Sequence, residues 1–132
     1  MKILIADDSH LMRERLCGLL MNMKASPIIE QAQDGREALE KLESFQPDAI
    51  ILDIRMPGKN GIQVLEKIRN SQRASVTLVF TNYTYPQYRN KCLNLGADYF
   101  FDKSTEFENM LEKLEQLSSQ AMCSEKCKAD IP

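Results

Sequence analysis

The sequence Asp48-Ala-Ile-Ile-Leu-Asp-Ile-Arg-Met-Pro-Gly58 decides the fold of this chain. Four apolar residues run from Ala49 to Leu52 without a polar break, and the run ends on the carboxylate of Asp53. Such a run is typical of a strand that is buried on both faces of a parallel sheet. The Met-Pro-Gly turn that follows must leave regular structure, because proline fixes φ and glycine accepts a tight turn. The stretch therefore predicts that Asp53 lies at the carboxyl end of a central strand, where open α/β sheets place their ligands.

Length and charge limit the classes of protein to consider. The chain has 132 residues, which suits a single domain with a proper core. Its 17 basic and 19 acidic residues give a net charge of -2, and no basic stretch tracks a nucleic acid backbone. We therefore expect no direct binding of nucleic acid. The apolar start of the chain stops at Asp7, too early for a signal peptide, and no segment has membrane-spanning length. We expect a soluble cytoplasmic protein with no membrane partner.

The four cysteines suit a reducing compartment. Cys17 and Cys92 fall within amphipathic helical patterns, which predicts reduced thiols in the core. Cys123 and Cys127 lie in the polar C-terminal part of the chain, and the only histidine is His10. Three residues separate these two cysteines, where zinc knuckles typically have two, so the sequence disfavours a zinc site.

Five short apolar runs organise the chain, and a segment of helical periodicity follows each of them. The runs predict strands at residues 3–6, 27–32, 49–52, 76–80 and 99–101. Five strand–helix units imply a parallel sheet with helices on both faces, because crossovers between parallel strands are almost always right-handed. The second run contains polar residues, which suits a sheet edge and favours the strand order 2-1-3-4-5. No G-x-G-x-x-G motif follows the first run, which disfavours a dinucleotide-dependent enzyme.

Apolar spacing and capping residues predict the helices. The first helix is expected to carry its apolar residues at helical spacing. Pairs of residues three positions apart are expected to cap three later helix starts, and a glycine is expected to end the fourth helix. These residues are Leu11, Met12, Leu16, Leu19, Leu20 and Met23 in the first helix, the pairs Asp34 with Glu37, Asn60 with Gln63 and Thr105 with Glu108, and Gly96. We expect a domain of residues 1–117 and a polar, flexible tail of residues 118–132.

Polar residues follow four of the predicted strands. Asp7 and Asp8 follow the first strand, Asp53 the third, Thr81 the fourth and Lys103 the fifth. Because parallel strands end at one edge of a sheet, we expect these side chains to converge there. Three neighbouring carboxylates repel one another, so the lysine and a divalent cation would have to offset their charge. Ligands that are all oxygen atoms favour Mg²⁺ or Mn²⁺ over zinc.

Such a cluster suits phosphoryl transfer. A carboxylate can attack phosphorus and form an aspartyl phosphate, and we interpret Asp53 as this phosphoacceptor. Asp8 and Asp53 would hold the metal ion together with the backbone carbonyl of Arg55. Asp7 would act mainly through a metal-bound water. The lysine and the threonine hydroxyl named above would stabilise the transferring group.

The chain resembles the receiver domain of bacterial two-component response regulators over residues 1 to about 117. The residues that carry the resemblance are Asp7-Asp8, Asp53 with Met56-Pro57, Thr81, Gly96-Ala97-Asp98 and Lys103. The resemblance implies a flavodoxin-like (βα)5 doubly wound sandwich with sheet order 2-1-3-4-5. It implies that Asp53 takes its phosphoryl group, in the presence of Mg²⁺, from the phosphohistidine of a sensor histidine kinase or a phosphotransfer protein. It also implies self-catalysed dephosphorylation and a downstream effector protein, here unidentified.

The resemblance further implies a switch. In the family, the hydroxyl residue at the position of Thr81 moves toward the phosphoryl group, and the aromatic residue at the position of Phe100 turns inward. The surface of the fourth helix, fifth strand and fifth helix would then carry the signal. The chain shows no effector domain of its own, which suggests a stand-alone, chemotaxis-type receiver. A receiver excised from a longer regulator is the alternative.

The chain departs from the family pattern at several positions. The residue after the switch hydroxyl is commonly alanine or glycine in the family, and the bulkier Asn82 is expected to narrow access to the phosphoryl group. Arg55 and Tyr83 occupy positions that tune the lifetime of the phosphorylated state in relatives. The family's proline after the lysine is here Ser104. We expect a trans peptide bond between Lys103 and Ser104, because a non-proline cis bond costs about 2.5 to 4 kcal/mol.

Two other classes of protein stay open. Taken singly, Thr81 fits an ordinary strand end, Lys103 a solvated charge and Asp8 a helix cap; taken jointly, the strand-end residues favour a functional site. One alternative is a haloacid-dehalogenase-like phosphatase, although the second acid it needs is replaced by Arg55. The other is a degenerate receiver that binds proteins independently of phosphorylation.

Overall fold

A five-stranded parallel sheet lies at the centre of the molecule, with strand order β2-β1-β3-β4-β5. The computed structural model describes residues 1–24, 26–58, 60–71 and 75–130, and the side chains of these residues as far as Ser119. The strands are β1 (Lys2–Ala6), β2 (Ile28–Ala32), β3 (Ala49–Leu52), β4 (Val76–Thr81) and β5 (Tyr99–Asp102). The helices are α1 (His10–Leu20), α2 (Gly35–Phe45), α3 (Gly61–Ser71), α4 (Pro86–Asn94) and α5 (Phe107–Asp130). The predicted fold class and strand order are confirmed.

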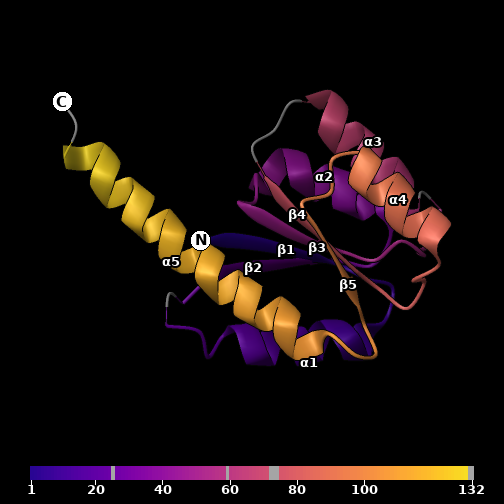
Figure 1. Cartoon of the computed structure of the whole chain (residues 1–132), viewed down its shortest axis with the longest axis horizontal. Helices are drawn as coiled ribbons and strands as arrows, with labels where there is room; N and C mark the ends of the chain where they lie inside the picture. Colours follow the sequence, from indigo (N-terminus) through magenta and orange to yellow (C-terminus); the bar gives the residue numbers. More distant parts are fainter. Residues whose placement is uncertain (25, 59, 72–74, 131–132) are drawn as a thin grey trace.

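The sheet separates two apolar cores. Helices α2, α3 and α4 cover one face, and α1 and α5 cover the other (Figure 1). Successive strand residues point to opposite faces, so Leu4 and Ile50 pack toward α2 and α3 while Ile3 and Ile51 pack toward α1 and α5. Because both faces are covered, all four residues of β3 are buried, as its unbroken apolar run predicted.

The second strand lies at the edge of the sheet, as its polar residues predicted. Ile28 is 61% exposed, and Glu30 faces solvent. The ammonium group of Lys41 donates a hydrogen bond to the carbonyl of Gln31 and lies 3.7 Å from a carboxylate oxygen of Glu30. A lysine against a strand edge is one way in which native sheets avoid pairing with other chains.

The capping residues of two helices are confirmed. The Asp34 carboxylate accepts the N–H of Glu37 at 2.8 Å, before α2. The Asn60 side chain accepts the N–H of Gln63, and the Gln63 side chain accepts the N–H of Asn60, at 3.0 and 2.9 Å before α3. Gly96 follows the end of α4 with φ of 98°, a left-handed conformation that favours glycine.

The start of the last helix differs from the prediction. Helix α5 begins at Phe107, so Glu106 rather than Thr105 precedes the first helical residue. The Glu106 carboxylate accepts the N–H of Asp102, and its own N–H donates to the carbonyl of Asp102. These two bonds close a turn after β5, and the helix begins one residue later than predicted. The predicted capping box of Thr105 and Glu108 is therefore wrong.

The end of α5 also differs. The helix continues to Asp130 instead of ending near Leu117, and Figure 1 shows it extending beyond the sheet. Residues 118–130 contain neither proline nor glycine, so nothing in this segment stops a helix. The side chains of Cys123 and Cys127 lie outside the described residues.

The apolar stripe predicted for the first helix is confirmed in part, because Leu16, Leu20 and Met23 are buried and Met12 packs against the same core. Leu11 is 80% exposed and Leu19 is 38% exposed, whereas Arg13, Leu16 and Leu20 are buried. The buried positions follow one another at intervals of three and four residues, and Leu11 lies off the face they define. Among the helices of the described part of the chain, none is both long enough and apolar enough to cross a membrane.

Candidate functional site at the carboxyl ends of the strands

The register of β1 and β3 brings two of the predicted acidic residues together. Ala6 pairs with Leu52, and the N–H of Asp53 donates to the carbonyl of Ala6 at 3.0 Å. Asp7 and Asp53 therefore leave adjacent strands at the same level, and Asp8 follows directly. One carboxylate oxygen from each of the three aspartates lies within 4.8 Å of the other two. The three acidic residues converge as the sequence predicted.

Lys103 completes this cluster. Its ammonium nitrogen lies 2.5 Å from Oδ2 of Asp7 and 2.9 Å from Oδ2 of Asp53, and its side chain is only 8% exposed. Its backbone N–H donates to the carbonyl of Thr81, which holds the loop after β5 against the end of β4. Burial alone would lower the pKa of Lys103, but hydrogen bonds and charge from Asp7 and Asp53 outweigh it and raise the pKa. The lysine is therefore a cation fixed between two carboxylates at neutral pH.

The peptide bond after this lysine is trans. The described residues contain no cis peptide bond, as expected where Ser104 replaces a proline. A trans bond is compatible with the short contacts of the Lys103 ammonium group with both carboxylates.

The donor atoms fit a hard divalent cation. Asp7 and Asp53 are buried and Asp8 is exposed, and all three offer carboxylate oxygens. The Arg55 N–H lies 3.4 Å from Oδ1 of Asp53, so the Arg55 backbone borders the cluster. Three carboxylates against one ammonium group leave a negative charge, which a divalent cation would offset. Oxygen donors without thiolate or imidazole suit Mg²⁺ or Mn²⁺.

The two predicted switch residues lie on β4 and β5. Thr81 is fully buried, and its hydroxyl accepts the N–H of Tyr83 at 3.2 Å. Phe100 pairs with Val79 of β4 and is half-buried, packed against the core beneath α2, α3 and α4. The guanidinium of Arg89, on α4, lies 5.9 Å from the centre of the Phe100 ring. Thr81 thus contacts the segment that leads into α4, and Phe100 contacts α4 itself.

Two of the predicted modulating residues, Arg55 and Tyr83, contact each other. Arg55 donates from Nη1 to the Tyr83 hydroxyl at 2.6 Å, and its guanidinium lies 4.9 Å from the centre of the Tyr83 ring. This hydrogen bond raises the pKa of Arg55. Tyr83 in turn meets Tyr88 edge to face, and Tyr88 meets Tyr85 in the same way. Asn82 is exposed. The segment after β3 therefore contacts the loop after β4 through Arg55 and Tyr83.

Gly61 also belongs to the site, although its sequence context did not predict this. A Cβ atom on Gly61 would lie 2.3 Å from the carbonyl oxygen of Asp53 and 2.7 Å from the Cα of Ile54. The Gly61 N–H donates to the Ile54 carbonyl at 2.6 Å. The first turn of α3 therefore packs directly on the backbone of Asp53. The available signal was a glycine in the first turn of a predicted helix, since glycine is often used where two backbones approach closely.

Arg13 was also not identified. It lies on α1 with a buried side chain, and its guanidinium donates to the carbonyl of Asp7 at 2.7 Å. An arginine within a helical pattern is typical of a solvated face, so the sequence offers no signal for this burial.

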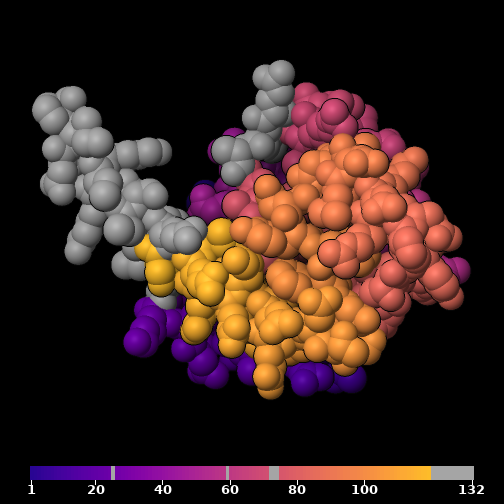
Figure 2. Space-filling view, viewed as in Figure 1, coloured from indigo at the N-terminus to yellow at the C-terminus, as the bar shows by residue number. Residues whose placement is uncertain are grey.

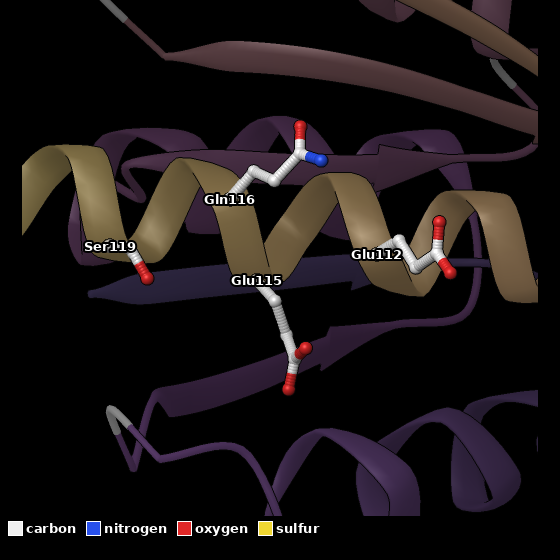
Figure 3. A pocket seen from close by; sticks show the side chains of 4 residues that line it. All are labelled: Glu112, Glu115, Gln116 and Ser119. Atoms are coloured by element: carbon white, nitrogen blue, oxygen red, sulfur yellow. The ribbon is translucent and has the colours of Figure 1, made fainter.

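An open hollow along α5 lies apart from the acidic cluster. Its lining residues are Glu112, Glu115, Gln116 and Ser119. Figure 3 shows Glu115 and Gln116 pointing to opposite sides of the helix, so these polar groups do not converge on a common ligand. The chemistry-bearing residues are those at the strand ends.

Comparison with known proteins gives consistent matches. The model of the response regulator receiver domain family matches residues 3–115. The nitrate/nitrite response regulator protein NarL of Escherichia coli strain K12 is 31% identical over 120 residues, covering 91% of this chain and 56% of NarL. The response regulator domain of Thermotoga maritima CheB has a TM-score of 0.77 at 29% identity, covering 92% of this chain and 96% of that chain.

A chemotaxis protein gives a similar structural match. Vibrio cholerae CheY4 has a TM-score of 0.77 at 30% identity, covering 87% of this chain and 96% of that chain. The curated relatives are longer, because the chain spans 56% of NarL and smaller shares of several others.

Proposed function

The chain belongs to the family of response regulator receiver domains, and from this premise we propose that Asp53 accepts a phosphoryl group from a phosphohistidine. The observation that carries the proposal is the position of Lys103, whose ammonium group contacts both Asp53 and Asp7. An ammonium group at this place offsets charge on the acceptor and on the group that is transferred to it. Family membership supports a sensor histidine kinase or a phosphotransfer protein as the donor.

The proposed transfer uses Asp53 as the nucleophile. A carboxylate oxygen of Asp53 attacks phosphorus, an O–P bond forms, and the P–N bond to the donor imidazole breaks. The imidazole leaves with the electron pair of that bond and takes up a proton. Lys103 stabilises the negative charge on the transferring oxygens, and water later hydrolyses the acyl phosphate to restore the carboxylate.

The acidic cluster is proposed to hold Mg²⁺ or Mn²⁺. Asp8 and Asp53 would be direct ligands with the Arg55 carbonyl, and Asp7 would act through a water. Such an ion, when bound, supplies positive charge that neutralises the phosphoryl oxygens. The support is the meeting of three carboxylates from two strand ends, two of them buried, with one lysine to offset them.

The proposed switch starts at Thr81. Its hydroxyl now accepts the N–H of Tyr83, and turning toward a phosphoryl oxygen would release this bond and free the loop. Phe100 would then turn inward, away from the Arg89 guanidinium. Shifting such an equilibrium from 1:99 to 99:1 requires roughly 5.5 kcal/mol of differential stabilisation.

The output surface is proposed to be formed by α4, β5 and α5. Figure 2 shows these segments, in orange and yellow, gathered on one face of the molecule. We propose that an effector protein binds there, and that the domain itself binds neither nucleic acid nor membrane. We further propose a cytoplasmic location, where the ATP that charges histidine kinases is available.

Arg55, Tyr83 and Asn82 are proposed to tune how long the phosphoryl group lasts. The Arg55 guanidinium is held over the Tyr83 ring at the rim of the site, close in sequence to Asp53. A cation in this place would stabilise an anionic phosphoryl group and hinder the approach of water. Asn82, which is exposed, would narrow the same approach.

Both alternative classes are less well supported. A degenerate receiver has no need for a buried lysine between two carboxylates, because burying these charges is costly. A haloacid-dehalogenase-like phosphatase needs a second acid where this chain has Arg55, and that arginine points to Tyr83. The domain is therefore proposed to catalyse only its own phosphorylation and dephosphorylation.

Chemical lability of the product separates these functions. The protein is incubated with acetyl phosphate and Mg²⁺, and the phosphoprotein is then treated with hydroxylamine. A receiver forms a protein-bound acyl phosphate that hydroxylamine removes, and it does not turn over para-nitrophenyl phosphate. Steady turnover of that ester would support the phosphatase, and no incorporation at all would support the degenerate receiver.

A further inference from the structure

A buried guanidinium lies behind the acidic loop. Arg13, on α1, has a relative exposure of 8%, although arginine is rarely buried without a partner. Its Nη1 donates to the backbone carbonyl of Asp7 at 2.7 Å, and its Nε donates to the side-chain oxygen of Gln31 at 3.0 Å. Its Nη2 lies 3.4 Å from Nδ1 of His10. One side chain thus connects α1, the loop after β1 and the edge strand β2.

We infer that Arg13 is a positioning residue for the metal-holding loop, an inference that rests on the proposed function. The carbonyl that it binds belongs to the peptide group joining Asp7 to Asp8. Fixing the plane of this peptide group fixes the directions in which both carboxylates leave the backbone. Mutation of a group that orients a metal ligand typically lowers the affinity for the metal by 10- to 100-fold.

The restraint matters most for Asp8. The Asp7 side chain is already held, because its carboxylate contacts Lys103 and accepts the N–H of Ser9 at 2.9 Å. Asp8 is exposed, so the direction of its carboxylate depends on the backbone that carries it. The bond from Arg13 to the Asp7 carbonyl acts on that backbone. Loss of the bond is therefore expected to disturb a direct metal ligand without removing any ligand.

The hydrogen-bond partners that the structure shows for Arg13 do not neutralise its positive charge. In the part of the chain that the structure describes, its guanidinium meets a carbonyl, an amide and an imidazole rather than a carboxylate. A buried charge of this kind is costly, and an apolar residue would fill the same space at lower cost. Its positive charge instead lies against the backbone carbonyl of Asp7, at the start of the loop that carries Asp8.

Magnesium titration by calorimetry tests the inference. Wild type is compared with Arg13→Met, which keeps most of the aliphatic stem, and with Arg13→Lys, which keeps a donor and the charge. The control is Arg36→Met, because Arg36 is 84% exposed on α2 and pairs with Glu40. We expect Arg13→Met to raise the dissociation constant for Mg²⁺ about tenfold or more. Arg13→Lys should recover part of this loss, because an ammonium group can donate to the Asp7 carbonyl but lacks the fork that also reaches Gln31. Arg36→Met should bind as wild type does.

The same titration separates positioning from mere support of the fold. If Arg13→Met melts at a lower temperature in EDTA yet binds Mg²⁺ as tightly as wild type, the inference is wrong. Should Arg13→Met fail to fold, Gln31→Ala releases one anchor of the guanidinium while leaving its bond to Asp7. It should then weaken Mg²⁺ binding to a smaller degree, and unchanged affinity in Gln31→Ala would overturn the inference. Failure of wild type to bind Mg²⁺ would instead contradict the proposed function itself.

Discussion

Lys103 and Asp53 lie fifty residues apart in the chain, yet the lysine nitrogen is 2.9 Å from a carboxylate oxygen of the aspartate. The two residues follow strands that are not neighbours, because β4 lies between β3 and β5. The lysine side chain therefore reaches across the end of β4, where Thr81 is located, and goes on to meet Asp7. This contact gathers the ends of four strands around one charged cluster.

The first prediction concerns the pH dependence of stability. Lys103→Met leaves two buried carboxylates without their cation, so we expect it to lower the free energy of unfolding at neutral pH by about 1–3 kcal/mol. The raised pKa of Lys103 means that its stabilising contribution is complete below the unfolded pKa, about 10.4, and is lost as pH rises through the folded pKa. Urea unfolding of both proteins from pH 8 to above pH 10.4 should show the difference shrinking at the alkaline end. A difference that stays constant would contradict the ion pair.

The second prediction concerns the close approach of α3. Gly61→Ala places a Cβ against the backbone of Asp53 and Ile54, where no side chain can move aside. We expect a loss of about 1–3 kcal/mol in the free energy of unfolding and slower phosphorylation of Asp53. Gly18→Ala is the matched control, because a Cβ there meets nothing within 4 Å and lies within α1. It should stabilise the protein by about 0.5–1 kcal/mol. Equal stability of the two variants would refute this account.

The third prediction concerns the lifetime of the phosphoryl group. Arg55→Ala removes a cation from the rim of the site, so dephosphorylation should become faster. Tyr83→Phe keeps the ring beneath Arg55 but loses the 2.6 Å hydrogen bond, so its effect should be smaller and in the same direction. Decay of the phosphoprotein after removal of the donor measures both. A longer lifetime in Arg55→Ala would show that the arginine promotes hydrolysis instead.

The fourth prediction concerns the core thiols. Burial raises the pKa of Cys92 to about 11, so little thiolate forms at pH 8. Iodoacetamide should therefore label Cys92 only after unfolding, while the half-buried Cys17 should react sooner in the native protein. Peptide mass mapping of samples labelled with and without urea makes the comparison. Rapid native labelling of Cys92 would show that α4 opens readily.

The central strand and several boundaries could be predicted from the sequence because the deciding interactions are local. The apolar run before Asp53 and the capping pairs Asp34–Glu37 and Asn60–Gln63 involve residues within a few positions of each other. The strand-end cluster could be predicted for a different reason. A parallel sheet places all strand ends on one edge, whatever the distance along the chain.

The predictions that differ from the structure concern helix bounds and buried faces. These features are determined by tertiary contacts or by the absence of a residue that stops a helix. Thr105 was expected to cap α5, but the bonds between Asp102 and Glu106 set the start of the helix. Leu11 fits helical spacing yet lies outside the buried face of α1. The burial of Arg13 against the Asp7 carbonyl depends on how α1 packs beside β2, which periodicity alone does not specify.

Identification of the phosphorylated residue tests the central claim most directly. Wild type, Asp53→Asn and the surface control Glu40→Gln are incubated with acetyl phosphate and Mg²⁺, and their intact masses are measured. The account predicts one added phosphoryl group on wild type and on Glu40→Gln, none on Asp53→Asn, and none on any protein when EDTA replaces Mg²⁺. Phosphorylation of Asp53→Asn to the same extent as wild type would contradict it.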